Sequence, residues 1–394
     1  MTQLESQSQQ AGVAGVAGVA GVAGVAGVAG VAGVAGVAGV AGVAGVAGVA
    51  GMPTYTGATG SLALPDALIK SRESLAYGVS PYWTNPKWTP PRWQSRRKPI
   101  ADGLPPGEDE DRLVDWQRNV VGFLVQTELL TSVTFVPTGS RSISIADKGG
   151  TTIISLSRPP LAHFLQQLSL VESYSELRAD RASEIVAQVG PQWSFWSSIV
   201  NLNTDRTPRT IELIGHALQF AMLCVMRVKH ALACPRPIEY SGLIQPMIQT
   251  PGYACLPSGH ATEAYMFATI MEHLLMLVGS RNPADQEMQT QIYRQAHRIA
   301  ENRVVAGLHF PVDSIAGKLL GQRLGRYFVS QCIGSKGSQE ATFSGEQVPG
   351  EAEPSAGVKY GTDPGTSLGA DSKTPTKPNA MLAKAWSLAA KEWR

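Results

Sequence analysis

Three short polar motifs lie in one order along the middle of the chain: KHALACPRP at residues 229–237, PSGH at 257–260 and RVVAGLHFPVD at 303–313. The sequence around them is apolar at helical spacing, so the motifs carry cations and histidines into or beside a buried core. Ionised groups are costly to bury unless an opposite charge meets them. The alternatives are three unrelated surface ion pairs or one pocket for a tetrahedral oxyanion, and only the pocket accounts for all three motifs together.

The chain has 394 residues and a formal net charge of +2. Residues 1–51 and 336–394 cannot contribute a core, so we predict one large helical catalytic domain at residues 108–335. The small net charge argues against a nucleic-acid-binding protein, which usually has a strong basic excess. The first ten residues contain no Lys or Arg, so we recognise no secretory signal and expect a cytoplasmic location by default.

Residues 11–51 are an uninterrupted Ala-Gly-Val triplet repeat. Its period does not match a helix of about 3.6 residues per turn, and it lacks flanking basic or aromatic anchors, so we do not expect a membrane span. A collagen triple helix calls for imino acids at the other positions, and the repeat has none. We expect residues 1–51 to form a disordered or elastin-like tail.

Residues 52–107 are rich in Pro, Gly and Trp, and Trp83, Trp88 and Trp93 lie among prolines and basic residues. Such a pattern can stack single-stranded nucleic acid. The alternative is an extended arm whose tryptophans fill grooves on its own domain, and the small net charge favours it. We predict an ordered but irregular arm and no nucleic-acid partner.

Apolar residues recur at helical spacing from Asp111 onward, which predicts an all-α fold, a helical bundle. Helices are expected at about 161–178, 180–189, 192–201, 209–232, 261–279, 284–305 and 311–331. Charged residues interrupt the two most apolar of them, so neither is predicted to cross a membrane. A β-branched run from Ser142 to Leu156, broken by Gly149 and Gly150, predicts a short hairpin.

The last of these helices carries Gly317, Gly321 and Gly325 on one face. Each glycine costs a helix about 1 kcal/mol relative to alanine, so the stripe predicts close approach of a second helix. Beyond Ile333 the chain is rich in Ser, Gly, Pro, Glu and Thr. We expect disorder over residues 336–378 and a helix over 379–394.

The residue types in the three motifs suit a phosphate-like anion. Its oxygens would accept from the paired N–H donors of the Arg236 and Arg303 guanidiniums. The ammonium of Lys229 adds a compact positive charge. Ser258 at a helix start adds a hydroxyl and, with the N–H of Gly259, presents the positive end of a helix to the anion. These residues predict an oxyanion site.

Two histidines complete the predicted site. His309 and Asp313 are four residues apart, so the carboxylate can fix the imidazole tautomer and raise its basicity, as nucleophilic or metal-bound histidines require. His260 would donate a proton on the opposite side of the anion. Each residue alone is usually structural, but the complete set predicts catalysis.

Cys234 and Cys255 precede Arg236 and Ser258 by a few residues. Nearby cations would lower the pKa of these thiols and raise their reactivity toward peroxide. The alternative, which we favour, is that both sulfurs are small buried packing groups.

In order and spacing, the motifs resemble the superfamily that joins vanadium-dependent haloperoxidases with type 2 phosphatidic acid phosphatases and bacterial nonspecific acid phosphatases. Its signature is Lys-x6-Arg-Pro, then Pro-Ser-Gly-His, then Ser-Arg-x5-His-x3-Asp. The chain matches every position except that Asn302 stands where a serine is expected. The surrounding helical pattern agrees with the resemblance, and both tails lie outside it.

The resemblance implies a vanadate cofactor bound directly by His309, with His260 as the acid–base group and Asp313 supporting His309. The residues that would hold the nonbonded oxygens are Lys229, Arg236, Ser258, Gly259 and Arg303. The implied reaction oxidises halide with hydrogen peroxide to hypohalous acid. In the phosphatase alternative, His309 attacks phosphorus and forms a phosphohistidine. A noncatalytic oxyanion-binding protein is the third alternative, which the intact histidines and aspartate disfavour.

Tyr253, five residues before Ser258, stands where the resemblance places an aromatic residue or a histidine on the halide side. It favours haloperoxidase over phosphatase, and the lack of several long apolar helices argues against a lipid phosphatase. The expected partners are hydrogen peroxide and a halide or small organic acceptor, without a membrane span. The number of subunits stays open, with a homo-oligomer as one alternative.

Overall fold

The structure is a computed structural model that describes residues 116, 118–277, 283–334, 340–356, 361–369 and 377–393. The predicted tail at 1–51 and arm at 52–107 lie outside the described residues.

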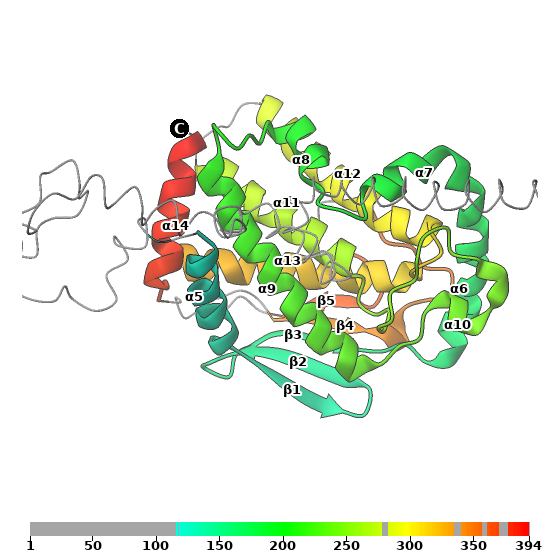
Figure 1. Ribbon diagram of the computed structural model, residues 1–394. Coiled ribbons are helices and arrows are strands. Elements are labelled where there is room, and N and C mark those ends of the chain that lie inside the picture. The colour runs from blue at the N-terminus through cyan, green and yellow to red at the C-terminus, as the bar shows by residue number, and fades with distance from the viewer. Residues whose placement is uncertain are drawn as a thin grey trace, which may run out of the picture. The chain divides into compact units, whose positions relative to one another are not determined.

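Helices make up most of the described chain (Figure 1). They are α5 (Arg118–Thr131), α6 (Leu161–Tyr174), α7 (Arg178–Ala187), α8 (Trp193–Val200), α9 (Pro208–Leu232), α10 (Pro237–Tyr240), α11 (Gly259–Leu277), α12 (Pro283–Val305), α13 (Pro311–Ile333) and α14 (Ala380–Ala390). Short 3-10 turns η4 (Ser175–Leu177), η5 (Gly242–Ile244), η6 (Gly345–Gln347) and η7 (Lys391–Trp393) join or end them. The helices predicted from apolar periodicity are all present, with ends shifted by a few residues.

The fold is mostly helical but not all-α, because a five-stranded mixed sheet accompanies the helices. Its strands are β1 (Val133–Gly139), β2 (Ser142–Asp147), β3 (Thr152–Ser157), β4 (Ala341–Ser344) and β5 (Thr366–Leu368), in that spatial order. The predicted hairpin is the antiparallel pair β2 and β3. The purely helical prediction was wrong because the other strands are short or largely exposed, and periodicity cannot detect such strands.

Strand β4 joins the sheet from far along the chain. It pairs parallel to β3, with Ile154 opposite Ala341 and Leu156 opposite Phe343, and β5 then pairs antiparallel to β4. Ala341 and Phe343 are fully buried. The prediction of disorder over 336–378 therefore fails for these strands, because pairing with β3 satisfies their backbone and buries their apolar side chains.

The glycine stripe of α13 lies against α11, as predicted. A Cβ atom on Gly317 would lie 2.6 Å from the carbonyl oxygen of Ser258, and one on Gly325 would lie 2.9 Å from Cβ of Thr269. A Cβ on Gly321 would collide with the backbone of Thr262. The stripe therefore brings the two helix backbones together and fixes the start of α11, which carries the PSGH motif, against α13.

Helix α9 is the apolar helix that packs beside this pair (Figure 1). Among the described residues, the helical stretch Pro208–Tyr240 alone is long and apolar enough by composition to cross a membrane. Phe220, Val225 and Val228 on it are fully buried. Core helices have the same composition, so this is weak evidence for a span.

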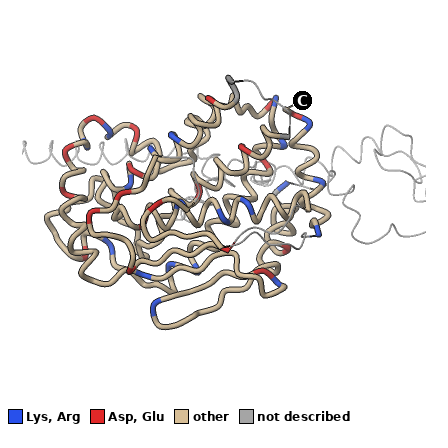
Figure 2. The backbone as a smooth tube through the Cα atoms, turned by 180° about the vertical axis from the view of Figure 1, so that it is seen from behind, with Lys and Arg blue, Asp and Glu red and all other residues tan. Residues whose placement is uncertain are grey.

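The C-terminal segment is held to the helices by buried charge. Nζ of Lys318 on α13 lies 2.8 Å from Oδ2 of Asp363, and both side chains are almost completely buried. The predicted terminal helix forms as α14, and Oε1 of Glu392 beyond it accepts from the backbone N–H of Arg209 at the start of α9. Basic and acidic positions are interspersed along the described backbone (Figure 2).

Candidate functional site

His309 lies in the turn between α12 and α13, and its imidazole is held at both nitrogens. Nδ1 lies 2.9 Å from Oδ2 of Asp313, and Nη1 of Arg236 lies 3.2 Å from Nε2. Because a guanidinium can only donate, Nε2 must accept, and the ring proton therefore sits on Nδ1 and points to the carboxylate. The lone pair of Nε2 faces the cation, as a histidine that binds or attacks an electrophilic centre requires.

Asp313 lies in the first turn of α13, where it both orients His309 and caps the helix. Its Oδ2 also accepts the backbone N–H of Phe310 at 2.9 Å, which caps the helix. Its own backbone carbonyl accepts the N–H of Ser258 at 2.9 Å and so ties the second motif to the third. The helix start that folds this turn therefore also fixes the orientation of His309.

Burial and neighbouring cations set the protonation of this pair. The pKa of His309 is held well below its ordinary value, first by burial and then by Arg236 and Lys229. Burial raises the pKa of Asp313 to about 6, opposed by the Phe310 N–H and Lys229. Near neutral pH the pair is a neutral imidazole on a carboxylate, so Nε2 carries a lone pair, which accepts from Nη1 of Arg236.

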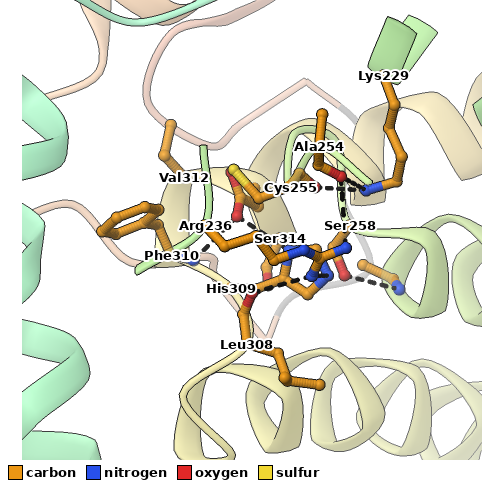
Figure 3. Close-up of polar contacts among 12 residues, drawn as sticks. Lys229, Arg236, Ala254, Cys255, Ser258, Leu308, His309, Phe310, Val312 and Ser314 are labelled. Carbon is orange, nitrogen blue, oxygen red and sulfur yellow. Dashed lines mark hydrogen bonds and ion pairs between the residues drawn. The ribbon is translucent and has the colours of Figure 1, made fainter. Parts of the chain in front are cut away.

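Arg236 is fully buried at the start of α10 and spans the site. Its Nε donates to the carbonyl of Tyr253 at 2.9 Å, and its Nη1 donates to the carbonyl of Leu308 at 3.0 Å. These bonds fix the guanidinium plane beside His309 (Figure 3). The chain turns after α9 at Ala233, which has a positive φ of 49°, and this turn directs Arg236 back into the core.

Lys229, in the last turn of α9, reaches the same place. Its Nζ donates to the carbonyls of Ala254 at 2.8 Å and Cys255 at 2.6 Å. An ammonium has three protons, so one donor remains for another acceptor. Burial, together with Arg236, lowers the pKa of Lys229 to about 7, and an anion bound beside it would oppose that shift.

Arg303, near the end of α12, has buried N–H donors without acceptors in the described part of the chain. Its Nη2 donates to the carbonyl of Ile185 at 3.1 Å and to Oε1 of Gln188 at 3.0 Å. Its Nε and Nη1 are buried and have no hydrogen-bond partner among the described residues. Burial lowers the pKa of Arg303 to about 10, so the guanidinium stays charged. A buried charged group with free donors calls for an acceptor.

The PSGH motif contributes from the start of α11. The backbone N–H groups of Gly259 and His260 lie in the first helical turn, where no intrahelical acceptor is available. Ser258 is fully buried, and its Oγ accepts only a long bond from Ala261 N–H, at 3.4 Å. Figure 3 shows Ser258 together with Lys229, Arg236 and His309, which come from separate elements.

His260 differs from the expectation that it donates a proton. Its Nε2 lies 3.0 Å from the carbonyl oxygen of Gln188, and because a carbonyl only accepts, the ring proton sits on Nε2. Burial, then Arg303, lowers the pKa of His260 to about 3. The ring is therefore neutral, with its lone pair on Nδ1, and it must take up a proton before it can give one.

The residues predicted from the three motifs are thus brought together in one buried cluster. Arg236, Lys229, His260 and Arg303 all act electrostatically on His309. Asp313 acts on Lys229 and Glu184 acts on Arg303, but Glu184 already accepts three hydrogen bonds from Arg298. The cluster carries excess positive charge, which a bound anion would neutralise.

Tyr253 lies beside the cations with its ring half-buried. The ring centroid is 5.1 Å from Cζ of Arg236 and 5.5 Å from Nζ of Lys229. Such contacts stabilise cations over an aromatic face. The role of Tyr253 on the halide side stays a prediction.

Sequence reasoning missed Gln188, which contacts both Arg303 and His260, because no motif contains it. Asn302 lies beside Gln188, and its Nδ2 donates to Oε1 of Gln188 at 3.0 Å. The residue that replaces the expected serine therefore supports the same corner of the site. No local signal in the sequence marks Gln188, since its partners lie far along the chain.

The burial of the two thiols agrees with the packing role that we favour and not with the reactive alternative. Cys234 and Cys255 are buried and unbridged, and burial raises the pKa of Cys234 to about 12 and that of Cys255 well above its usual value. Desolvation outweighs the nearby cations. The Sγ of Cys255 lies 3.6 Å from Oδ1 of Asp313, so this thiol packs against the carboxylate that orients His309.

These features define a class of site: a buried, cation-rich oxyanion site with one carboxylate-oriented histidine. Within the part of the chain that the structure describes, no three His, Cys, Asp or Glu side chains gather as ligands for a free metal cation. Arginine and lysine side chains around His309 would repel such a cation and attract an anion.

The comparisons with known proteins match a different part of the chain. The family model described as the collagen triple helix repeat (20 copies) matches residues 7–65, which lie outside the described residues. Glycine at every third position meets the strict requirement of that repeat even without imino acids, so our exclusion of a collagen-like repeat needs correction. No curated protein matches the chain.

The superfamily membership predicted from the three motifs is wrong on this comparison, because no haloperoxidase or phosphatase family matches. Three short motifs fix few positions, whereas a family is defined by similarity along a whole domain. The function must therefore be argued from the geometry of the site itself.

Asp313→Asn tests whether the carboxylate orients His309. We expect orthovanadate, which His309 would hold directly, to bind about 10- to 100-fold more weakly, the usual range for a group that supports a ligand, and inorganic phosphate to lose far less affinity. Binding is measured by titration calorimetry. Asp147→Asn is the matched control, because Asp147 caps a turn by accepting the N–H of Thr151. Equal orthovanadate affinity in wild type and Asp313→Asn would contradict the orienting role.

Proposed function

We propose that the protein binds a tetrahedral oxyanion among Lys229, Arg236 and Arg303 and, with vanadate held by His309, oxidises halide with hydrogen peroxide. The observation that carries this proposal is the buried guanidinium of Arg303, whose Nε and Nη1 have no partner among the described residues. An anion supplies the missing acceptors and the missing negative charge at once.

The donors around His309 suit vanadate as they would suit phosphate. Lys229 has one proton left, Arg303 offers its unpartnered Nε and Nη1, and the start of α11 offers backbone N–H groups. When bound, vanadate supplies an electrophilic centre at which peroxide is activated toward halide. Lys229, Arg236 and Arg303 would hold the charge of its oxygens, and the neutral His309 would bind it through Nε2.

His260 favours peroxide chemistry over ester hydrolysis. Its proton is engaged with the Gln188 carbonyl, and Nδ1 carries a lone pair. Nδ1 would accept a proton from an incoming peroxide once the negative charge of bound vanadate raises the pKa of the ring, whereas ester hydrolysis needs a group at the leaving oxygen that is already protonated. The half-buried ring of Tyr253 would form the wall on the halide side.

A second candidate is hydrolysis of a phosphomonoester through a phosphohistidine on His309. The observation that favours it is the neutral, carboxylate-oriented imidazole beside three cations, which also suits attack on phosphorus. His260 would first have to gain a proton, which the negative charge of a bound phosphate would promote.

One pair of assays separates these functions. Protein loaded with orthovanadate is given hydrogen peroxide and bromide, and halogenation of a phenolic dye is followed. The same protein without vanadate is given a nitrophenyl phosphate. We expect halogenation that depends on vanadate and little ester hydrolysis. Ester turnover without halogenation would overturn the proposal in favour of the phosphatase, and phosphate binding with neither activity would indicate a noncatalytic oxyanion-binding protein.

A further inference from the structure

Gln188 is a fully buried glutamine directly after α7, outside all three motifs. Its side-chain Oε1 accepts from Nη2 of Arg303 and from Nδ2 of Asn302, each at 3.0 Å. Its Nε2 lies 3.4 Å from Oε1 of Glu184. The carboxamide is therefore held from both ends, and its oxygen is directed at Arg303.

The contact with Gln188 decides which nitrogens of Arg303 stay free. Nη2 is occupied by Gln188 and by the Ile185 carbonyl, so the guanidinium cannot turn about its long axis without breaking both bonds. Among the described residues, Nε and Nη1, which lie on either side of the occupied Nη2, are left without partners. Each of these charged N–H donors can bind an oxygen of an oxyanion.

The backbone of Gln188 acts on the second histidine. Its carbonyl oxygen lies 3.0 Å from Nε2 of His260 and thereby keeps the ring proton on that nitrogen. One residue thus controls the orientation of an oxyanion donor through its side chain and the tautomer of His260 through its main chain.

We infer that Gln188 is a positioning residue for the oxyanion site, which holds the free Nε and Nη1 of Arg303 toward the bound anion and fixes the tautomer of His260. This inference rests on the proposed function. It also explains why an amide suits this position: a carboxylate would accept the same hydrogen bonds but neutralise Arg303, in competition with the anion.

Two variants separate positioning from a merely structural role. Gln188→Glu keeps an acceptor for Arg303 and Asn302 but adds negative charge and loses the donor to Glu184, so we expect some loss of stability while inorganic phosphate binds about 10- to 100-fold more weakly. Gln188→Met removes the acceptor at similar volume, and we expect a similar loss of affinity together with some loss of stability. A merely structural glutamine would give weaker folding in Gln188→Met and unchanged affinity in Gln188→Glu.

The matched control is Gln126→Met, because Gln126 is a buried glutamine whose Nε2 donates to the His216 carbonyl, away from the three motifs. Phosphate affinity is measured by calorimetry and folding by thermal unfolding, so neither readout needs halogenation. Unchanged affinity in both Gln188 variants, with wild type binding phosphate, would overturn this inference alone. Failure of wild type to bind phosphate or orthovanadate would overturn it and the proposed function together.

Discussion

Replacing His309 by alanine is expected to lower vanadate-dependent halide oxidation about 1,000-fold or more, because the group that binds the reacting centre is lost. Affinity for inorganic phosphate should fall far less, by about 10-fold or below. Lys229, Arg236 and Arg303 remain in the variant, and the Nη1 proton that Arg236 gives to His309 becomes free for the anion. The separation of a large activity loss from a small affinity loss is what distinguishes a covalent partner from a binding donor.

His273→Ala is the matched control for this experiment. His273 is a half-buried histidine on α11, whose Nδ1 lies 2.7 Å from the carbonyl of Thr269, and the variant should keep full activity. Halogenation rates are measured over a range of orthovanadate concentrations, so that weak loading is not mistaken for lost chemistry. Equal rates in wild type and His309→Ala would place the chemistry elsewhere in the chain.

Arg303→Met is expected to weaken phosphate and orthovanadate binding by about 100-fold or more, the effect of removing a charged donor from a buried anion. The same change should leave the protein without anion as stable as wild type, or more stable by about 1 to 2 kcal/mol. A buried cation with unpartnered donors is costly, and an apolar side chain of similar length removes that cost. Binding and stability are therefore expected to move in opposite directions.

Arg294→Met controls for loss of positive charge on the same helix. Arg294 is largely exposed and lies 3.8 Å from Glu287, so its removal should alter neither anion affinity nor stability by much. Denaturant unfolding with and without phosphate measures both quantities at once. A large loss of stability in Arg303→Met without anion would mean that Arg303 serves the fold rather than the site.

Local sequence pattern was sufficient for the helices and for much of the candidate site. Apolar periodicity placed the helices, and Gly317, Gly321 and Gly325 predicted the close contact between α11 and α13 because only a residue without Cβ permits it. The spacing of His309 and Asp313 predicted their hydrogen bond, since residues four apart at a helix start lie close together. These are short-range relations, which the order of residues settles by itself.

Other features depend on segments that are distant in the chain. Strand β4 forms only because β3 offers a partner, and its four residues carry too little pattern to be recognised alone. The thiols of Cys234 and Cys255 are desolvated by the surrounding core, so burial outweighs the nearby cations that sequence proximity suggested. Likewise, no motif predicts that Gln188 accepts from Arg303, 115 residues away.

The sequence by itself determined which residues form helices and which glycines let two helices touch. It also determined which cations and histidines occur in the three motifs. Only the tertiary structure decided that Arg303 keeps two nitrogens unpartnered, that His260 carries its proton on Nε2, and that His309 turns its lone pair toward Arg236. The physical reason is that protonation and hydrogen bonding depend on what surrounds a group in space. Burial and distant partners set that environment, and neither can be read from neighbours in the chain.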